Sequence, residues 1–298
     1  MSGSSRTPPT FLRRLHEPVV GVAAWGLYGL LRLIGQDASM RLARSRWLPQ
    51  LGQRAINALF RKRNRYLDRN LALVFPGMSE AERHRFVQRH YQHLATTGVR
   101  SIFLTEKGFN TASIDGLETV QALGEQGIIF VTAHSGHWDL IKRNNLLLGF
   151  PCHFLYRGVS NPCVDRLLRR VRSRFATPVA VTDMAGYIDR IRNGQHVLFM
   201  PDLKVKKGRN GRKLSLCGHP AWTSTFIAEM ALAYHRPIVP VYVVEQPDGS
   251  LRQVFETPVD LSSGDKTVIQ QRINDSISAR LLAHPEAWAL WNTNRWGP

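Results

Sequence analysis

The stretch that decides the fold of this chain is Gly127-Ile128-Ile129-Phe130-Val131-Thr132-Ala133-His134-Ser135-Gly136-His137-Trp138-Asp139. Its first half is a short apolar run, which is typical of a strand buried in a parallel sheet. Ser135 and Gly136 permit a turn after His134, because glycine allows close backbone approach. A helical pattern follows from about residue 136 to 148. The stretch therefore predicts a strand, a turn and a helix in succession.

The segments after this stretch continue to alternate. We expect further strands at 153–156, 178–181, 196–200 and 238–244, and further helices at 164–175, 187–192 and 224–234. An antiparallel segment at 251–259 and a final helix from 267 complete the chain. Such alternation builds a mostly parallel sheet with helices on both faces. We therefore predict an α/β domain over residues 111–298, with a mostly parallel mixed sheet flanked by helices.

The amino end differs from the rest of the chain. Residues 1–17 are predicted to be a flexible basic segment, and residues 19–31 form an apolar run that is followed by Arg32. This run is shorter than the ~20 residues that cross a bilayer comfortably. It predicts a membrane anchor helix at 18–36, which is either a short tilted span or an embedded helix. A secretory signal is the alternative, but no clear small-residue cleavage site follows the run.

Residues 37–110 are predicted to be a basic helical region. Many Lys and Arg residues lie between positions 41 and 69, and Ser79 followed by Glu80 and Glu82 predicts a capped helix start. One interpretation of the basic stretch is a solvated helix face. The other is a helix on anionic lipid, where each basic group contributes ~1 kcal/mol. Because the basic stretch directly follows the predicted membrane anchor, a helix on the lipid surface is favoured at least as much as a solvated helix face.

Charge is the unusual feature of the composition. The chain has 40 Lys and Arg against 22 Asp and Glu, a formal net charge of +18. Such an excess attracts phosphates, anionic lipid head groups or an acidic protein partner. We expect no nucleic-acid partner, because no helix-turn-helix, zinc-finger or RNA-sheet signature accompanies the charge. The cysteines show no disulfide or CxxC spacing, which is typical of a reducing compartment.

His134 and Asp139 are the candidate catalytic residues. His134 follows the predicted strand, and active sites of open α/β sheets gather at the carboxyl ends of strands. On one continuous helix, side chains five residues apart point about 140° away from each other and cannot meet. They can meet if His134 lies in the turn and Asp139 in the helix. An imidazole held by a carboxylate is a general base, and backbone amides near the helix start would stabilise an oxyanion.

Two alternatives compete with this interpretation. A histidine at a strand end is often a hydrogen-bonded structural residue. His134, His137 and Asp139 lie close enough in sequence to suggest a metal site. Zinc-binding helices usually place two histidines four residues apart, whereas the interval here is three, so the metal site is the weaker alternative.

The chain resembles a known family at several points along its length. The matching motifs are Asn70-Leu71-Ala72-Leu73-Val74-Phe75-Pro76, Thr132-Ala133-His134-Ser135-Gly136-His137-Trp138-Asp139, Tyr156-Arg157 with Asn161-Pro162, Met200-Pro201-Asp202, Leu216-Cys217-Gly218-His219-Pro220-Ala221 and His284-Pro285-Glu286-Ala287-Trp288. They resemble motifs of the bacterial lipid A biosynthesis lauroyl/myristoyl acyltransferases, relatives of the glycerol-3-phosphate and lysophosphatidic acid acyltransferases within the lysophospholipid acyltransferase superfamily. One such motif would be weak evidence for the resemblance, but several motifs in the right order are strong evidence.

This resemblance implies a membrane-associated O-acyltransferase with a glycerol-3-phosphate acyltransferase-like fold. It implies an acyl carrier protein or coenzyme A thioester as the acyl donor. A lipid hydroxyl at the cytoplasmic face of the inner membrane would be the acceptor. It also implies a single amino-terminal membrane helix and no metal, and we expect no cofactor. His134 and Asp139 match the family's His-x4-Asp/Glu motif, which would make His134 the base and Asp139 the residue that orients it.

The resemblance also points to substrate-binding residues. Arg157 would clamp a phosphate, because a guanidinium fork matches phosphate geometry; the alternative is one more surface arginine. The basic residues between 204 and 213 are expected to form a mobile loop, which is either solvated or holds an acidic head group. The other predicted substrate-binding residues are Gly136, Asn161, Asp202 and Gly218.

The acceptor is less well defined than the chemistry. His137 stands where the family commonly has Asn, Asp139 where the lipid A branch usually has Glu, and Leu203 where Gln usually follows Pro-Asp. Asp at this position is normal in the glycerolipid branch. The candidate acceptors are therefore a lipid A precursor, a lysophospholipid, an aminolipid and a glycolipid. Two other classes compete: a catalytically inactive basic lipid- or nucleic-acid-binding protein on the same fold, and a metal hydrolase.

Overall fold

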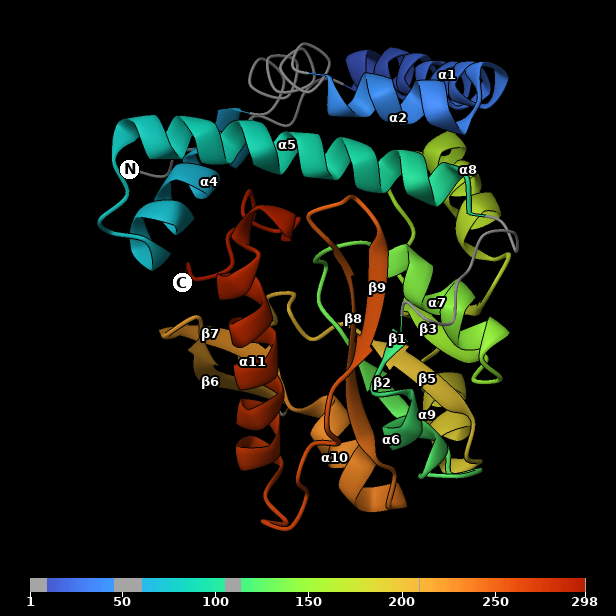
Figure 1. Ribbon diagram of the computed structural model, residues 1–298, viewed down its shortest axis with the longest axis vertical. Helices are drawn as coiled ribbons and strands as arrows, with labels where there is room; N and C mark the ends of the chain where they lie inside the picture. Colours follow the sequence, from blue (N-terminus) through green and yellow to red (C-terminus); the bar gives the residue numbers. More distant parts are fainter. Residues whose placement is uncertain (1–9, 46–60, 105–113, 209, 298) are drawn as a thin grey trace.

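A seven-stranded sheet forms the centre of the molecule (Figure 1). The structure is a computed structural model and describes residues 10–45, 61–104, 114–208 and 210–297. The strands of this sheet lie in the order β1-β9-β8-β2-β5-β3-β4. Their bounds are β1 Ile114–Asp115, β2 Ile129–Val131, β3 Cys152–Tyr156, β4 Thr177–Ala180, β5 His196–Phe199, β8 Ile238–Glu245 and β9 Leu251–Phe255.

Strand β2 lies inside the sheet and runs parallel to both of its neighbours. Ile129 pairs with Ile238 of β8 on one side and with Val197 of β5 on the other. Strands β3 and β4 continue the parallel part beyond β5. Strand β9 is antiparallel to β8, and β1 is parallel to β9. The predicted mostly parallel mixed sheet is confirmed.

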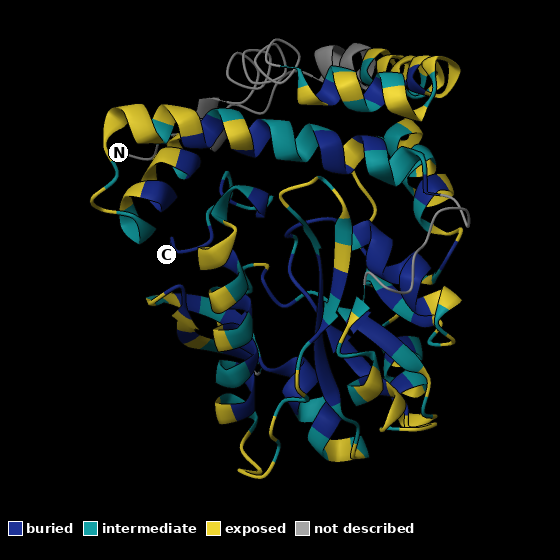
Figure 2. Ribbon diagram, in the orientation of Figure 1, coloured by how far each residue is buried: buried dark blue, intermediate teal, exposed yellow. Residues whose placement is uncertain are grey.

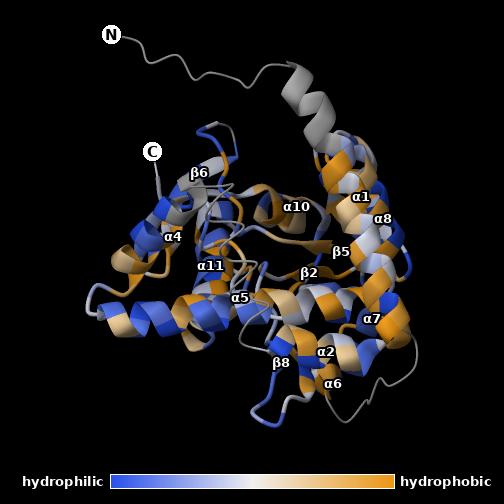
Figure 3. Cartoon of the chain, turned by 90° about the horizontal axis from the view of Figure 1, so that it is seen from above, coloured by the Kyte–Doolittle hydropathy of each residue, from blue (hydrophilic) through white to orange (hydrophobic). Residues whose placement is uncertain are grey.

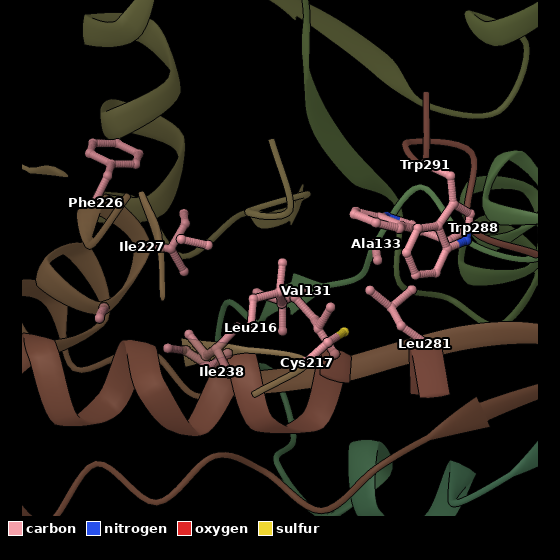
Figure 4. Packing of buried hydrophobic residues seen from close by; sticks show 14 of the residues in the cluster. Val131, Ala133, Leu216, Cys217, Phe226, Ile227, Ile238, Leu281, Trp288 and Trp291 are labelled. Carbon is pink, nitrogen blue, oxygen red and sulfur yellow. The ribbon is translucent and has the colours of Figure 1, made fainter. Parts of the chain in front are cut away.

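Helices cover both faces of the sheet, and the centre of the sheet is buried (Figure 2). Val131 of β2 lies in one hydrophobic cluster with Ile227 and Leu281 (Figure 4). Phe130, on the opposite face of the strand, lies in a second cluster with Ile141. The helices that supply these and the neighbouring contacts are α6 Leu117–Gln121, α7 Trp138–Leu147, α8 Pro162–Arg172, α9 Met184–Arg192, α10 Phe226–Tyr234, α11 Lys266–Ala283 and the short 3₁₀ helix η2 Pro285–Ala287.

The amino-terminal part of the chain is helical. Its described helices are α1 Thr10–Ile34, α2 Gln36–Arg44, α4 Arg61–Val74 and α5 Glu80–Ile102. Helix α5 begins at the predicted cap, where the Ser79 side chain accepts from the Glu82 amide and the Glu82 carboxylate accepts from the Ser79 amide. Helices α1 and α2 lie together beyond α5 (Figure 1). The Trp25 indole of α1 donates to the carbonyl of Cys163 in α8 at 3.1 Å.

Helix α1 carries many apolar residues (Figure 3), and several of them are exposed. Its exposed apolar side chains are Val19, Val22, Leu27, Leu30, Leu33 and Ile34. No helix of the described ranges is by itself long and apolar enough to cross a membrane, whereas α1 from Pro18 and α2 meet that criterion together across a bend of 115°. Helix α1 begins at Thr10, before the predicted boundary at residue 18. Residues 1–9 of the predicted flexible segment and residues 46–60 and 105–110 of the predicted basic region lie outside the described residues.

The predicted mobile loop at 204–213 is only partly a loop. Its last residues begin the hairpin of β6 Gly211–Leu216 and β7 His219–Ser224. The physical reason is an alternating pattern, because Leu214 and Leu216 are buried while Lys213 and Ser215 are exposed. Cys217 and Gly218 form the two-residue turn, and both have positive φ angles, as a tight hairpin of this kind requires.

Helix α11 provides a test of the packing. Leu281 is fully buried in the cluster beneath the sheet, whereas its neighbour Leu282 is 46% exposed. Leu281→Ala should lower the free energy of unfolding by about 2–5 kcal/mol, because it leaves a cavity. Leu282→Ala should lower it by no more than about 0.5 kcal/mol. Urea unfolding of both variants measures the difference, and equal losses would contradict this placement of α11.

Candidate active site

His134 lies in the loop that follows β2, with a carboxylate directly behind its ring. Nδ1 of His134 is 2.8 Å from Oδ1 of Asp202. The second oxygen, Oδ2, accepts from the His134 backbone amide at 2.7 Å and from the Trp288 indole at 2.9 Å. The Asp202 side chain is fully buried, whereas that of His134 is 25% exposed. His134 therefore has a fixed inner edge and an accessible outer edge.

Sheet register explains why these two residues meet. Val131 at the end of β2 pairs with Phe199 at the end of the parallel strand β5. His134 lies three residues beyond the first and Asp202 three residues beyond the second. Parallel neighbours end at the same edge of a sheet, so equal offsets bring the two side chains together.

The electrostatics define the tautomer of His134. Burial by itself would raise the pKa of Asp202, but the electrostatic interaction with His134 and the hydrogen bonds from His134 and Trp288 outweigh it and lower that pKa. A charged carboxylate only accepts hydrogen bonds, so Nδ1 of His134 donates. This leaves Nε2 as the ring nitrogen available to a substrate.

Asp139 is not the residue that orients His134, and this part of the prediction is wrong. Its carboxylate contacts Lys142 Nζ at 2.6 Å, Ser101 Oγ at 3.1 Å and Arg172 Nε at 3.3 Å. Burial opposes the charge of Asp139, but Lys142 and Arg172 outweigh it and hold the pKa of this carboxyl well below its ordinary value. The reason is that α7 starts only at Trp138, so Asp139 lies in its first turn and faces Lys142 one turn later.

A pocket of about 570 Å³ joins His134 and Asp139. Much of its wall is apolar, with Phe154, Leu198 and Phe226 among its residues. Four cationic side chains also line it. They are Lys142, Arg157, Arg172 and Lys204. Such a mixture suits a ligand with an apolar chain and anionic groups.

The predicted substrate-binding residues are only partly brought together. Arg157 lines the pocket, and Asp202 is bonded to His134. Asn161 instead caps α8, where its side chain accepts from the amides of Cys163 and Val164. Gly218 lies in the turn of the β6–β7 hairpin. Lys142 and Arg172 were missed, although the Asp139–Lys142 spacing of three residues is a recognisable helical ion pair.

Gly136 faces away from this pocket. Its φ is +61°, and an added Cβ would lie 2.2 Å from the carbonyl oxygen of Val243. The Gly136 amide donates to Ala287 and the His137 amide to Val243, while the Ala289 amide donates to the His134 carbonyl. These loop amides are therefore bonded within the protein and do not supply the predicted oxyanion site. The residue at the N-cap of α7 is His137, and Ser135 lies before it in the loop.

The residues of the suggested metal site point in different directions. His134 faces Asp202, Asp139 faces Lys142, and His137 faces Glu245 with Nε2 at 3.2 Å from Oε2. His137 is fully buried, and burial lowers its pKa to about 4. The fold therefore does not bring His134, His137 and Asp139 together as the ligands of one metal ion.

The chain is similar to known proteins over most of its length. The model of the family described as bacterial lipid A biosynthesis acyltransferase matches residues 10–297. The chain is 25% identical to the lipid A biosynthesis lauroyltransferase of Escherichia coli (strain K12), over 81% of each chain. It is 24% identical to a lipid A biosynthesis acyltransferase of Haemophilus influenzae, over 72% of this chain and 71% of the relative. It is 22% identical to the lipid A biosynthesis acyltransferase 2 of Shigella flexneri, over 80% of this chain and 79% of the relative.

Gly136, in the loop between β2 and α7, has a matched control in Gly124, which lies between α6 and β2. Gly136 and Gly124 both have positive φ, but an added Cβ at Gly124 meets no atom within 4 Å. Gly136→Ala should therefore cost about 1–3 kcal/mol more than Gly124→Ala, because only the first adds a backbone clash to the strain. Chemical unfolding of the two variants measures this difference. Equal costs would show that the loop does not lie against Val243.

Proposed function

Because the chain belongs to the bacterial lipid A biosynthesis acyltransferase family, and is therefore an acyltransferase, we propose that it moves a fatty-acyl group from a thioester donor to a hydroxyl of a lipid A-type acceptor. The observation that carries the proposal is the His134–Asp202 pair at the wall of an apolar pocket lined by cations. The pair supplies a base, and the pocket suits a lipid with anionic groups.

In the proposed reaction His134 is the general base. Its Nε2 takes the proton of the acceptor hydroxyl as that oxygen attacks the thioester carbonyl, and Asp202 holds the ring and stabilises the imidazolium. The tetrahedral intermediate then collapses with loss of the thiolate. The thiolate takes the proton from His134, so the products are an ester and a free thiol, and the base is regenerated.

In this proposal, one part of the pocket binds the fatty-acyl chain and another binds the phosphate groups. The apolar wall around Phe154 and Phe226 would hold a fatty-acyl chain. Lys142, Arg157 and Arg172 would hold phosphate groups, because the phosphates of a lipid A-type acceptor and of the donor are anionic. Asp139 would position Lys142 and Arg172, which it contacts directly. The net charge of +18 supports an acidic partner such as acyl carrier protein.

We further propose that the amino-terminal part lies in and on the cytoplasmic face of the inner membrane. The exposed apolar side chains of α1 support insertion of residues 18–36. Residues 37–110 would then lie on the anionic surface, where basic side chains gain affinity. Residues 111–298 would form the catalytic domain.

Acyl transfer is tested with purified protein, a lipid A precursor, and labelled acyl carrier protein or acyl coenzyme A in separate assays. The wild type should label the lipid, and His134→Ala should lower the rate by about 10²–10⁴-fold, because it lacks the base. His84→Gln is the control, since His84 is an exposed residue of α5 that bonds only Gln88 among the described hydrogen bonds. Mass spectrometry identifies the product. Equal rates for wild type and His134→Ala would contradict the role of His134. Labelling of a lysophospholipid or aminolipid but not the lipid A precursor would contradict the acceptor.

Asp202→Asn and Asp139→Asn separate the roles of the two carboxylates. Asp202→Asn should lower kcat by about 10²–10⁴-fold with little change in KM, because the His134 ring loses its anionic partner. Asp139→Asn should mainly raise KM for the phosphorylated acceptor, because Lys142 and Arg172 lose their anchor. Thermal unfolding of both variants shows whether they are folded. A large loss of kcat in Asp139→Asn with full activity in Asp202→Asn would overturn this assignment.

A further inference from the structure

A second group of polar side chains lies behind the loop that carries His134. His93 of α5, His137 of the loop and Glu245 of β8 place one ligand-type atom each within 4.8 Å of one another. The His93 and His137 ring centroids are 5.1 Å apart. The proposed acyl transfer uses none of these side chains, and the pocket of His134 is lined by other residues.

Each of the two imidazole rings has a hydrogen bond on one side that fixes its orientation. Nδ1 of His137 lies 3.3 Å from Thr97 Oγ1, which leaves Nε2 facing Glu245. The His93 ring is hydrogen-bonded to the Gly136 backbone, and its Nε2 is buried with no hydrogen-bond partner among the described residues. Imidazoles that bind metal ions usually have the other ring nitrogen fixed in this way. Within the described part of the chain, the Nε2 of His93 is thus left available as a metal ligand.

The separations suit a transition-metal ion. Nε2 of His137 and Oε2 of Glu245 are 3.2 Å apart, and two ligand atoms on a tetrahedral zinc ion lie roughly 3.3 Å apart. His93 has to approach the other two, and the Glu245 side chain is partly exposed, so it can adjust. A pocket of about 210 Å³, lined by His93 and Glu245, connects the group to solvent and leaves room for a water ligand.

The types of ligand atom select among possible ions. Arg44 and Arg100 both donate to Oε1 of Glu245 and leave Oε2 free of them. A single free carboxylate oxygen is a poor site for Mg²⁺, which prefers an octahedron of oxygen ligands. Two imidazoles and one carboxylate instead match the donor set of Zn²⁺. Glu286 lines the same pocket and adds a compensating negative charge.

We propose that His93, His137 and Glu245 bind a zinc ion that braces the loop carrying His134. The ion connects α5, the loop after β2 and the end of β8. It is a structural ion that takes no part in acyl transfer. The proposal goes beyond the proposed function and does not depend on it.

The test is zinc binding by tag-free, chelator-treated full-length protein, measured by calorimetry, by elemental analysis after desalting and by the thermal midpoint. ZnCl₂ should bind with one ion per chain and raise the midpoint by several degrees, whereas MgCl₂ should not. His93→Gln and His137→Asn should each weaken zinc binding by at least about tenfold. His84→Gln, on the same helix as His93 but exposed, should bind zinc like the wild type.

His137→Asn is a mild substitution, because Asn is common at this position of the motif that the chain resembles. Its midpoint without zinc shows whether it is folded, and Glu245→Gln provides a third variant. Absence of zinc binding to the wild type would overturn the proposal. So would zinc binding of unchanged affinity and stoichiometry in His93→Gln and His137→Asn. Because the readouts are affinity and stability, loss of acyl transfer has no bearing on the result.

Discussion

The buried carboxylate of Asp202 holds the site together. It accepts from the His134 ring, the His134 amide and the Trp288 indole, so one side chain connects the ends of β2 and β5 with the carboxyl-terminal segment. An unpaired buried charge would be strongly unfavourable, whereas these donors satisfy both oxygens. The position of His134 is therefore a consequence of the sheet and of the packed tryptophan.

The parts of the fold that follow from local patterns were predictable from sequence. The apolar run before His134 is β2, Ser79 and Glu82 form the expected cap, and the alternation of strands and helices gives the mostly parallel sheet. The β6–β7 hairpin was missed because its charged residues suggested a solvated loop. The alternation of Leu214 and Leu216 with Lys213 and Ser215 was the signal that identifies it.

The partner of His134 was predicted wrongly because sequence proximity was taken for spatial proximity. Asp139 is five residues away along the chain, but Asp202 is one strand away across the sheet. Strand order decides between them, and sequence alone does not fix which strand lies beside β2. With β5 as the parallel neighbour, the equal offsets of His134 and Asp202 from their strand ends determine the pair. The contact of His137 with Glu245 depends in the same way on β8 being the other neighbour.

The two carboxylates near the pocket are suited to different tasks because their surroundings differ. Asp139 is contacted by Lys142 and Arg172, so its charge is already balanced by two cations that line the pocket. If it also bound an imidazolium, it would have to share its two oxygens among three positive groups. Asp202 contacts one titratable donor, His134, and two neutral ones. In the proposed reaction, the charge on the ring would therefore meet an anion that has no salt bridge to Lys or Arg among the described residues, although the charge of Arg295 acts on it at longer range. Stabilising that imidazolium is what a general base requires of its partner. These surroundings support the proposal that Asp202 stabilises protonated His134 and that Asp139 positions the cations proposed to bind anionic groups.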